Sequence, residues 1–192
     1  MNSVSQNGRN GPSLWEEIRT NSKLDYDNTK PQIIEALKKY DSHQYLINRL
    51  SKNGQRYLFY TVSEALKRDL PVELSLIPFV ESQFDPYAQS STGASGIWQF
   101  IPSTALENGL KKNWWYDARR DIVASTNAAY NFLVKLNEEH DDWLIAIAAY
   151  NAGPSRVRKE IRKNKEKGLP TDFWSLNPVS YTHLRAHETC VH

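Results

Sequence analysis

The sequence predicts an all-α domain, and three observations support this fold class. Apolar residues recur at helical spacing in several segments, no segment alternates convincingly between apolar and polar residues as a strand does, and no internal repeat is found. With 192 residues, the chain is long enough for one well-packed domain and too short for two ordinary ones. We therefore expect a single helical core.

The N-terminal part is expected to be a short lead-in followed by helices. Residues 1–13 are rich in Asn, Ser and Gly, which favours a disordered segment. Residues 14–70 are expected to form a helical segment that packs on the domain after it, with helices over 31–40, 42–50 and 55–68. The last helix carries an apolar stripe formed by Tyr57, Leu58, Val62, Ala65 and Leu66.

Five further helices are expected, over residues 72–81, 102–109, 118–140, 142–151 and 155–167. Pro78 removes one backbone hydrogen bond from the first of them and should bend it just before Glu81. Asp121 suits the start of a helix, where its charge complements the helix dipole. The segment 142–151 is apolar on all sides, which indicates a helix at the centre of the domain.

The tail over residues 179–192 differs from everything before it. It holds three of the five histidines and the single cysteine, and it has no periodic apolar pattern. One interpretation is a metal cluster of His183, His187 and Cys190, since the two histidines have the i, i+4 spacing of helical ligands. The other is a non-native extension, and on that interpretation we exclude the tail from the fold.

Composition narrows the functional classes. The net charge is +2, from 24 basic and 22 acidic residues, so nothing in it indicates a nucleic-acid partner. No stretch approaches the ~20 apolar residues of a membrane span. The N-terminus has no apolar signal core, so the chain is either cytosolic or a fragment whose targeting segment is missing. The single cysteine, Cys190, excludes an internal disulfide.

Glu81 has the most unusual setting of any charged residue. It follows Leu76-Ile77-Pro78-Phe79-Val80, one of the most apolar stretches of the chain. A carboxyl group buried there without a cationic partner has a raised pKa, which suits a general acid near neutral pH. The alternative is a glutamate at a helix end that turns into solvent.

A polar loop after Glu81 can line a sugar site. It runs from Asp85 to Gly96, is rich in Ser, Thr and Gly, and leads to Trp98 and Gln99. Hydroxyl groups and the Gln99 amide can pair with sugar hydroxyls or an N-acetyl group. Trp98 can either stack on a sugar ring or belong to the core.

Three short motifs carry a resemblance to a known family. They are Glu81-Ser82, then Gly96-Ile97-Trp98-Gln99, then Ala149-Tyr150-Asn151-Ala152-Gly153. In this order they resemble the signature motifs of the soluble-lytic-transglycosylase (SLT) domain of glycoside hydrolase family 23. The resemblance covers about residues 14–177. It implies a lysozyme-like helical fold, as in goose-type lysozyme, around a glycan cleft, with the catalytic domain over residues 71–178.

The resemblance also implies roles for individual residues. Glu81 is the expected catalytic acid/base, and the expected substrate-binding residues are Ser82, Ser90, Gln99, Tyr150 and Asn151. For Tyr150 and Asn151 the alternative is helix packing and a helix C-terminus. The family's fourth motif, a tyrosine that orients the catalytic glutamate, falls where the tail begins. We do not assign this role to Tyr181, which belongs to the tail.

The absence of a second carboxylate bears on the reaction. Ordinary glycosidases use two carboxyl groups. Near Glu81 the other acid is Asp85, and Asp85-Pro86 is more typical of a turn than of a nucleophile. In the family the 6-hydroxyl of N-acetylmuramic acid attacks C1 instead, which gives a 1,6-anhydro product and requires no metal or cofactor.

Two further segments have open interpretations. Trp114-Trp115-Tyr116 can be a sugar platform or can fill a gap beside the cleft. The basic run from Arg156 to Lys167 can approach an anionic wall polymer or can be a solvated helix face.

By resemblance, the expected function is lytic transglycosylation of peptidoglycan glycan strands. The rival hypotheses are a goose-type lysozyme that uses water as the nucleophile and a non-catalytic wall-binding protein. The resemblance also implies a bacterial, periplasmic, outer-membrane-associated location. A membrane anchor and LysM repeats are expected in a full-length protein and are absent from this chain.

Overall fold

The computed structural model describes residues 13–25, 29–31, 33–35, 38 and 54–176. Residues 1–12 of the expected lead-in over 1–13, the expected helix over 42–50 and the tail over 179–192 lie outside these residues, and Ser13 is the N-cap of α1 (Leu14–Thr20). In the described part of residues 31–40, the positions Pro31, 33–35 and 38 are helical.

The all-α prediction is confirmed. The described residues form α1 (Leu14–Thr20), α4 (Gln55–Lys67), the 3-10 helix η2 (Val72–Leu76), α5 (Ile77–Ser82), α6 (Pro102–Glu107), α7 (Ile122–His140), α8 (Trp143–Ala152) and α9 (Pro154–Glu166). Within that part of the chain, β-structure is limited to isolated bridges in the loops.

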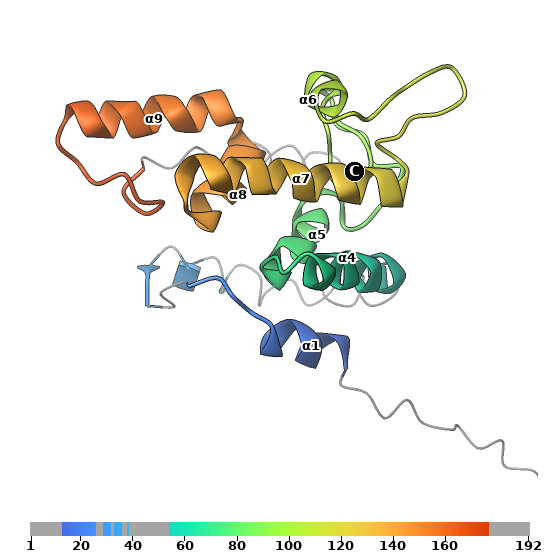
Figure 1. The fold of residues 1–192 in the computed structure, drawn as a ribbon, viewed down its shortest axis with the longest axis horizontal. Helices are drawn as coiled ribbons and strands as arrows, with labels where there is room; N and C mark the ends of the chain where they lie inside the picture. The colour runs from blue at the N-terminus through green and yellow to red at the C-terminus, as the bar shows by residue number, and fades with distance from the viewer. Residues whose placement is uncertain (1–12, 26–28, 32, 36–37, 39–53, 177–192) are drawn as a thin grey trace, which may run out of the picture.

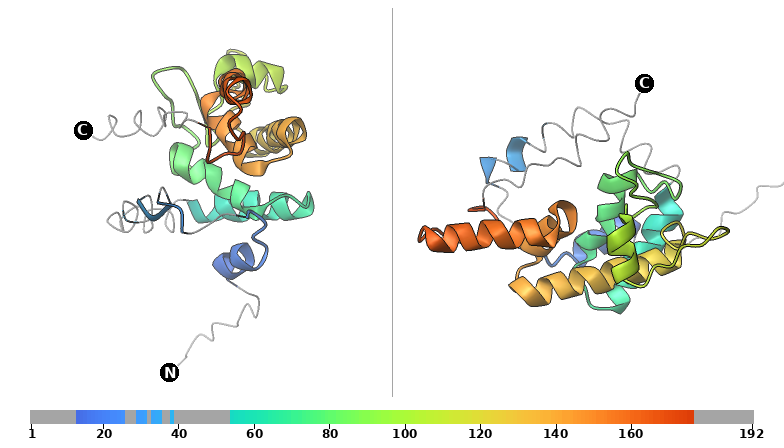
Figure 2. Two further views of the ribbon diagram at one scale, coloured as in Figure 1. Left: turned by 90° about the vertical axis from the view of Figure 1, so that its left-hand side faces the viewer. Right: turned by 90° about the horizontal axis from the view of Figure 1, so that it is seen from above.

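The short helix α5 lies between other helices, with α4 on one side and α7 and α8 on the other (Figures 1 and 2). The core around it combines the buried stripe of α4, which includes Leu58 and Val62, with Tyr130 and Leu133 of α7. A second, smaller cluster joins α8 to α9 through Val157. Every residue of α8 is at least partly buried, as its apolar surface predicts.

The prediction of a single bent helix over residues 72–81 is wrong. The structure has two helices there, with the break between Leu76 and Ile77, and Pro78 stands in the first turn of α5. A first-turn proline is favourable because the N–H that it lacks has no partner within the helix. Pro78 therefore starts the helix that carries Glu81.

The expected helix over 118–140 starts later, at Ile122. Asp121 is its N-cap and accepts a hydrogen bond from the backbone N–H of Ala124 at 2.9 Å. Residues 118–120 instead belong to a turn against the loop after α5, in which the N–H of Arg120 donates to Asp117 O. One face of this helix is buried and includes Ala129, Leu133 and Leu136.

The segment before α4 contacts the turn that leads into α5. Ile18 of α1 joins the main core, and the backbone N–H groups of Lys23 and Leu24 each donate to the Glu73 carboxylate at 3.0 Å. These contacts stabilise η2, on which α5 is stacked. No helix within the described ranges is long and apolar enough to cross a membrane.

Candidate active site

Glu81 lies in the last turn of α5, and the chain turns sharply just after it. Gln83 and Phe84 both have positive φ, at 53° and 60°. Non-glycine residues rarely adopt this left-handed conformation, and two in succession end the helix at once. The ring of Phe84 is fully buried, which holds the turn in place.

The carboxyl group of Glu81 is buried. The residue is 9 % exposed, and within the described part of the chain its side chain makes no hydrogen bond or ion pair. Burial raises its pKa from the ordinary 4.5 to about 7. The alternative that Glu81 turns into solvent is therefore wrong, and the group holds or releases its proton near neutral pH.

Ser82 joins α5 to the loop that follows. Its hydroxyl lies 3.1 Å from Pro78 O and 2.9 Å from Ile97 O, and the residue is buried. A hydroxyl has one proton to donate, and both neighbours are carbonyl acceptors. This geometry favours a positioning role for Ser82 beside Glu81 over the substrate contact expected from the motif.

The loop from Asp85 to Ile101 folds back on itself. Ser95 forms isolated antiparallel β-bridges with both Gln89 and Phe100. The Ser90 hydroxyl accepts from the backbone N–H of Ala94 at 3.0 Å and lies 2.8 Å from the Thr92 hydroxyl. Ser90 is thus held by hydrogen bonds within the loop.

Gln99 is bent into the loop by a left-handed backbone, with φ at 49°. Its Nε2 donates to Gly96 O at 2.8 Å and to Ala88 O at 3.2 Å. The amide nitrogen is therefore committed to the loop. Its Oε1 accepts no hydrogen bond from any described residue and is the part of the side chain that remains for a ligand.

Trp98 belongs to the core, so its alternative role as a sugar platform is wrong. It is 0 % exposed, and its Nε1 donates to the Thr126 hydroxyl on α7 at 3.0 Å. The backbone oxygen of the same residue accepts a hydrogen bond from the Tyr150 hydroxyl of α8 at 2.8 Å. Trp98 therefore ties the loop to both α7 and α8.

Tyr150 lies close to Glu81. Burial raises the pKa of the Tyr150 hydroxyl well above its usual value, and negative charge on Glu81 raises it further. The three sequence motifs lie on α5, on the loop and on α8, and the structure brings these elements together. Asn151 follows on α8, is half-buried, and makes no side-chain hydrogen bond to a described residue.

Asp117 and Arg119 support the site from outside the motifs. Arg119 is 4 % exposed and donates to both carboxylate oxygens of Asp117, at 2.9 and 2.6 Å. It also donates to Gly93 O at 2.7 Å and Phe100 O at 3.2 Å, at the two sides of the loop. Nothing in the sequence distinguishes Arg119 from its neighbour Arg120, so this role was not predicted.

The acids near the loop are engaged elsewhere. Asp85 accepts from the backbone N–H of Tyr87 at 2.9 Å, which confirms its predicted turn. Asp117 pairs with Arg119, and Asp121 caps α7. In the part of the chain that the structure describes, no cluster of His, Cys, Asp and Glu side chains has the arrangement of a metal site.

The described residues define a class: a helical domain with a buried carboxyl group, that of Glu81, which has no ion-pair partner among them and is held between a short helix and a folded-back loop. Comparison with known proteins narrows this class. A model of the Transglycosylase SLT domain family matches residues 61–172. The chain belongs to this family, which confirms the resemblance carried by its motifs and, with it, the lysozyme-like helical fold.

Several curated relatives agree with this assignment. Membrane-bound lytic murein transglycosylase D of Escherichia coli (strain K12) is 44 % identical over 164 residues, which is 85 % of this chain and 36 % of the relative. A tributyltin chloride resistance protein of Alteromonas sp. (strain M-1) is 41 % identical over 72 % of this chain and 68 % of its own length. Membrane-bound lytic murein transglycosylase F of Desulfosudis oleivorans is 33 % identical over 55 % of this chain and 24 % of its own length.

The raised pKa of Glu81 predicts a pH-dependent gain in stability for Glu81→Gln. Between its ordinary pKa of 4.5 and its folded pKa of about 7, the carboxyl group is ionised in the unfolded chain and protonated in the fold. The fold therefore loses stability as pH rises through this window. Glutamine does not titrate, so the variant should gain on the parent by at most about 3 kcal/mol between pH 4.5 and pH 8.

Urea unfolding at several pH values measures this difference. The difference in free energy of unfolding between variant and parent should grow as pH rises. A difference that stays the same at every pH would come from the amide alone and would contradict the raised pKa.

Gly96→Ala is expected to destabilise the loop. A Cβ at Gly96 would lie 1.8 Å from Arg119 O, and φ there is +82°. The clash falls on backbone that cannot move aside, so we expect a loss of at least about 2 kcal/mol in thermal unfolding. Gly109→Ala is the matched control, because φ is +78° but nothing lies within 4 Å. It should lose only about 1 kcal/mol, and equal losses would contradict the predicted clash.

Proposed function

We propose that this domain is a lytic transglycosylase that cleaves the β-1,4 bond between N-acetylmuramic acid and N-acetylglucosamine in peptidoglycan. The observation that carries the proposal is the buried, unpaired carboxyl group of Glu81 with a pKa of about 7. Family membership and the names of two of these relatives, lytic murein transglycosylases D and F, support the same activity.

In the proposed reaction Glu81 acts twice. Its protonated form donates to the glycosidic oxygen as the bond from that oxygen to C1 breaks. The resulting carboxylate accepts the proton of the muramic acid 6-hydroxyl, whose oxygen bonds to C1. The product is a 1,6-anhydromuramic acid end, no water is consumed, and Glu81 regains its proton. A pKa near 7 makes both protonation states accessible.

The other carboxylates support this reaction over ordinary glycoside hydrolysis. A retaining glycosidase needs a second carboxyl group as nucleophile, and an inverting one needs it as a base for water. Asp85 holds a turn, and Asp117 is paired with Arg119, whose hydrogen bonds hold the pKa of Asp117 below its usual range. A nucleophile supplied by the substrate fits a site with one available acid.

The proposed substrate contacts come from three elements. Gln99 offers its Oε1 to an N-acetyl N–H or a hydroxyl, Ser90 offers its hydroxyl from the loop, and Asn151 offers an amide without a protein partner among the described residues. Tyr150 is proposed to fix the loop beside Glu81 through its bond to Trp98 O. Ser82 is proposed to position α5.

We also propose that the domain acts in the periplasm as part of a longer protein. The chain spans 36 % of the length of the E. coli relative, whose name describes it as membrane-bound. An outer-membrane anchor and LysM repeats, which bind peptidoglycan, would suit the remaining length.

The proposal predicts that Glu81→Gln abolishes glycan release. Loss of the acid should lower the rate by about 10²-fold or more, because glutamine cannot donate the proton. The assay is muropeptide release from purified peptidoglycan, with circular dichroism to show that the variant is folded. Glu107→Gln is the matched control, because Glu107 is an exposed carboxylate at the end of α6, and it should retain full activity.

Mass spectrometry of the products separates the alternatives. Anhydromuramic ends are expected. Reducing ends would instead indicate a goose-type lysozyme reaction with water, and equal release by parent and Glu81→Gln would indicate a non-catalytic role for that residue.

The rate of cleavage is expected to fall as pH rises above about 7. The first step needs protonated Glu81, and deprotonation follows its pKa of about 7. Initial rates measured at non-saturating peptidoglycan from pH 5 to pH 9 report the free domain and should show this loss with a single ionisation. A rate that keeps rising to pH 9 would exclude Glu81 as the acid.

A further inference from the structure

The segment between α6 and α7 forms a hydrogen-bonded turn that projects beside α6 (Figure 1). Lys112 and Asp117 form an isolated antiparallel β-bridge at its base, and the N–H of Asn113 donates to Tyr116 O at 2.8 Å. The side-chain oxygen of Asn113 accepts from the backbone N–H groups of both Trp115 and Tyr116, at 2.8 Å each. These bonds define the backbone that carries the aromatic side chains.

The turn exposes two large aromatic side chains. Trp114 is 88 % exposed and Trp115 is 91 % exposed, so the prediction that they fill a gap is wrong. Their ring centroids lie 6.5 Å apart, with the planes at 87°. The two indoles thus meet almost at right angles and form an edge-to-face pair. Such apolar area left in water is typical of a binding surface.

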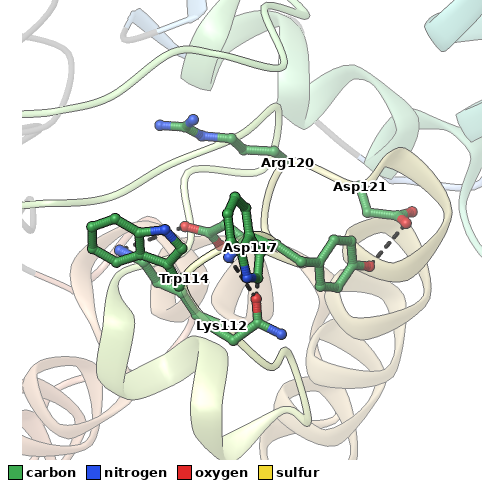
Figure 3. A pocket seen from close by; sticks show the side chains of 8 residues that line it. Lys112, Trp114, Asp117, Arg120 and Asp121 are labelled. Carbon is green, nitrogen blue, oxygen red and sulfur yellow. Dashed lines mark hydrogen bonds and ion pairs between the residues drawn. The ribbon is translucent and has the colours of Figure 1, made fainter.

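Charged groups complete a hollow of about 460 Å³ around these rings (Figure 3). Its lining residues are Lys112, Asn113, Trp114, Trp115, Tyr116, Asp117, Arg120 and Asp121. The two carboxylates in it are already engaged: Asp117 accepts from Arg119, and Asp121 accepts from the Tyr116 hydroxyl at 2.9 Å.

Arg120 supplies positive charge without a bound carboxylate. Its Nε lies 3.3 Å from the Ser95 hydroxyl, and in the described ranges it forms no ion pair. The hollow therefore combines aromatic faces with a cation that is able to bind an anion. Arginine presents several N–H donors in a planar fork that matches a carboxylate.

The hollow is connected to the candidate active site through the loop. Ser95, which contacts Arg120, is bridged to Phe100, next to Gln99. The hollow and the candidate site thus share the loop from Asp85 to Ile101 as a common support. A glycan strand extends well beyond the two sugars whose bond would lie at Glu81.

We propose that the hollow binds an uncleaved stretch of the same glycan strand, and that it recognises an acidic sugar. The C–H face of a pyranose ring would pack on an indole, and the lactyl carboxylate of muramic acid would pair with Arg120. The inference rests on the proposed function, since it extends the substrate that the domain cleaves. Two features suit a strand better than the flat surface of a membrane. The indoles stand nearly at right angles to each other, and a hollow lies beside them.

Binding to a catalytically inactive protein tests the site. In the Glu81→Gln background, isothermal calorimetry would follow strands of alternating N-acetylglucosamine and N-acetylmuramic acid from which the peptides have been removed. The double change Trp114→Ala, Trp115→Ala should weaken binding by about tenfold or more. Phe59→Ala is the matched control, because Phe59 is an exposed aromatic residue on α4, and it should leave the affinity unchanged.

Arg120→Gln tests the charge. It should weaken binding of these acidic strands severalfold and reduce the sensitivity of the affinity to salt. Binding of N-acetylglucosamine oligomers of equal length, which have no carboxylate, should respond to the tryptophan change and not to Arg120→Gln. Thermal unfolding of each variant shows that the fold is kept.

Several outcomes would overturn the site. One is unchanged affinity in the double tryptophan variant, and another is no binding of strands by the Glu81→Gln protein. Binding to phosphatidylglycerol vesicles that depends on Trp114 and Trp115, with no loss of glycan affinity, would assign the rings to a membrane surface. Failure of the proposed reaction would appear separately, as a parent protein that does not cleave.

Discussion

The site depends on the burial of one carboxyl group that has no opposite charge beside it in the described part of the chain. Placing Glu81 in the last turn of a six-residue helix between α4 and α8 removes water from it and leaves the pKa near 7. An ion pair would cancel this effect by favouring the carboxylate. The absence of a cation among the described neighbours is therefore as important to the chemistry as the glutamate, and the domain gives up stability above neutral pH for it.

A second constraint holds the loop against this helix. Three groups converge on it: Ser82 from α5, Tyr150 from α8 and Arg119 from the turn before α7. Arg119 is buried and paired, and loss of one partner of such a pair leaves a charge without compensation. Gly96 lets the loop approach Arg119 O more closely than any side chain would allow. The loop is thus positioned by contacts from segments far apart in sequence.

Local patterns in the sequence predicted most of the helices, because each buries one stripe or caps one end in a recognisable way. The stripe of α4 and the Asp121 cap are examples. The break before Pro78 was not predicted, since a proline fits both a bend and a first turn. The apolar stretch before Glu81 did predict its burial. The separate roles of Arg119 and Arg120 depend on tertiary contacts, and adjacent arginines carry no local sign of which one is buried.

A single acid/base also shifts part of the catalytic task to substrate positioning. If the nucleophile is a hydroxyl of the substrate itself, its approach to C1 depends on how the sugar is held, and holding reacting atoms in register lowers the barrier by saving entropy. Contacts remote from the reacting bond can supply that orientation. On our proposal, the turn that exposes two indoles beside Arg120 would provide it, and Arg120 contacts Ser95 in the loop that carries Gln99. On the proposed reaction the two features have separate tasks: the exposed aromatic pair would hold the strand, and the strand's own 6-hydroxyl would replace the nucleophilic carboxylate of a retaining glycosidase.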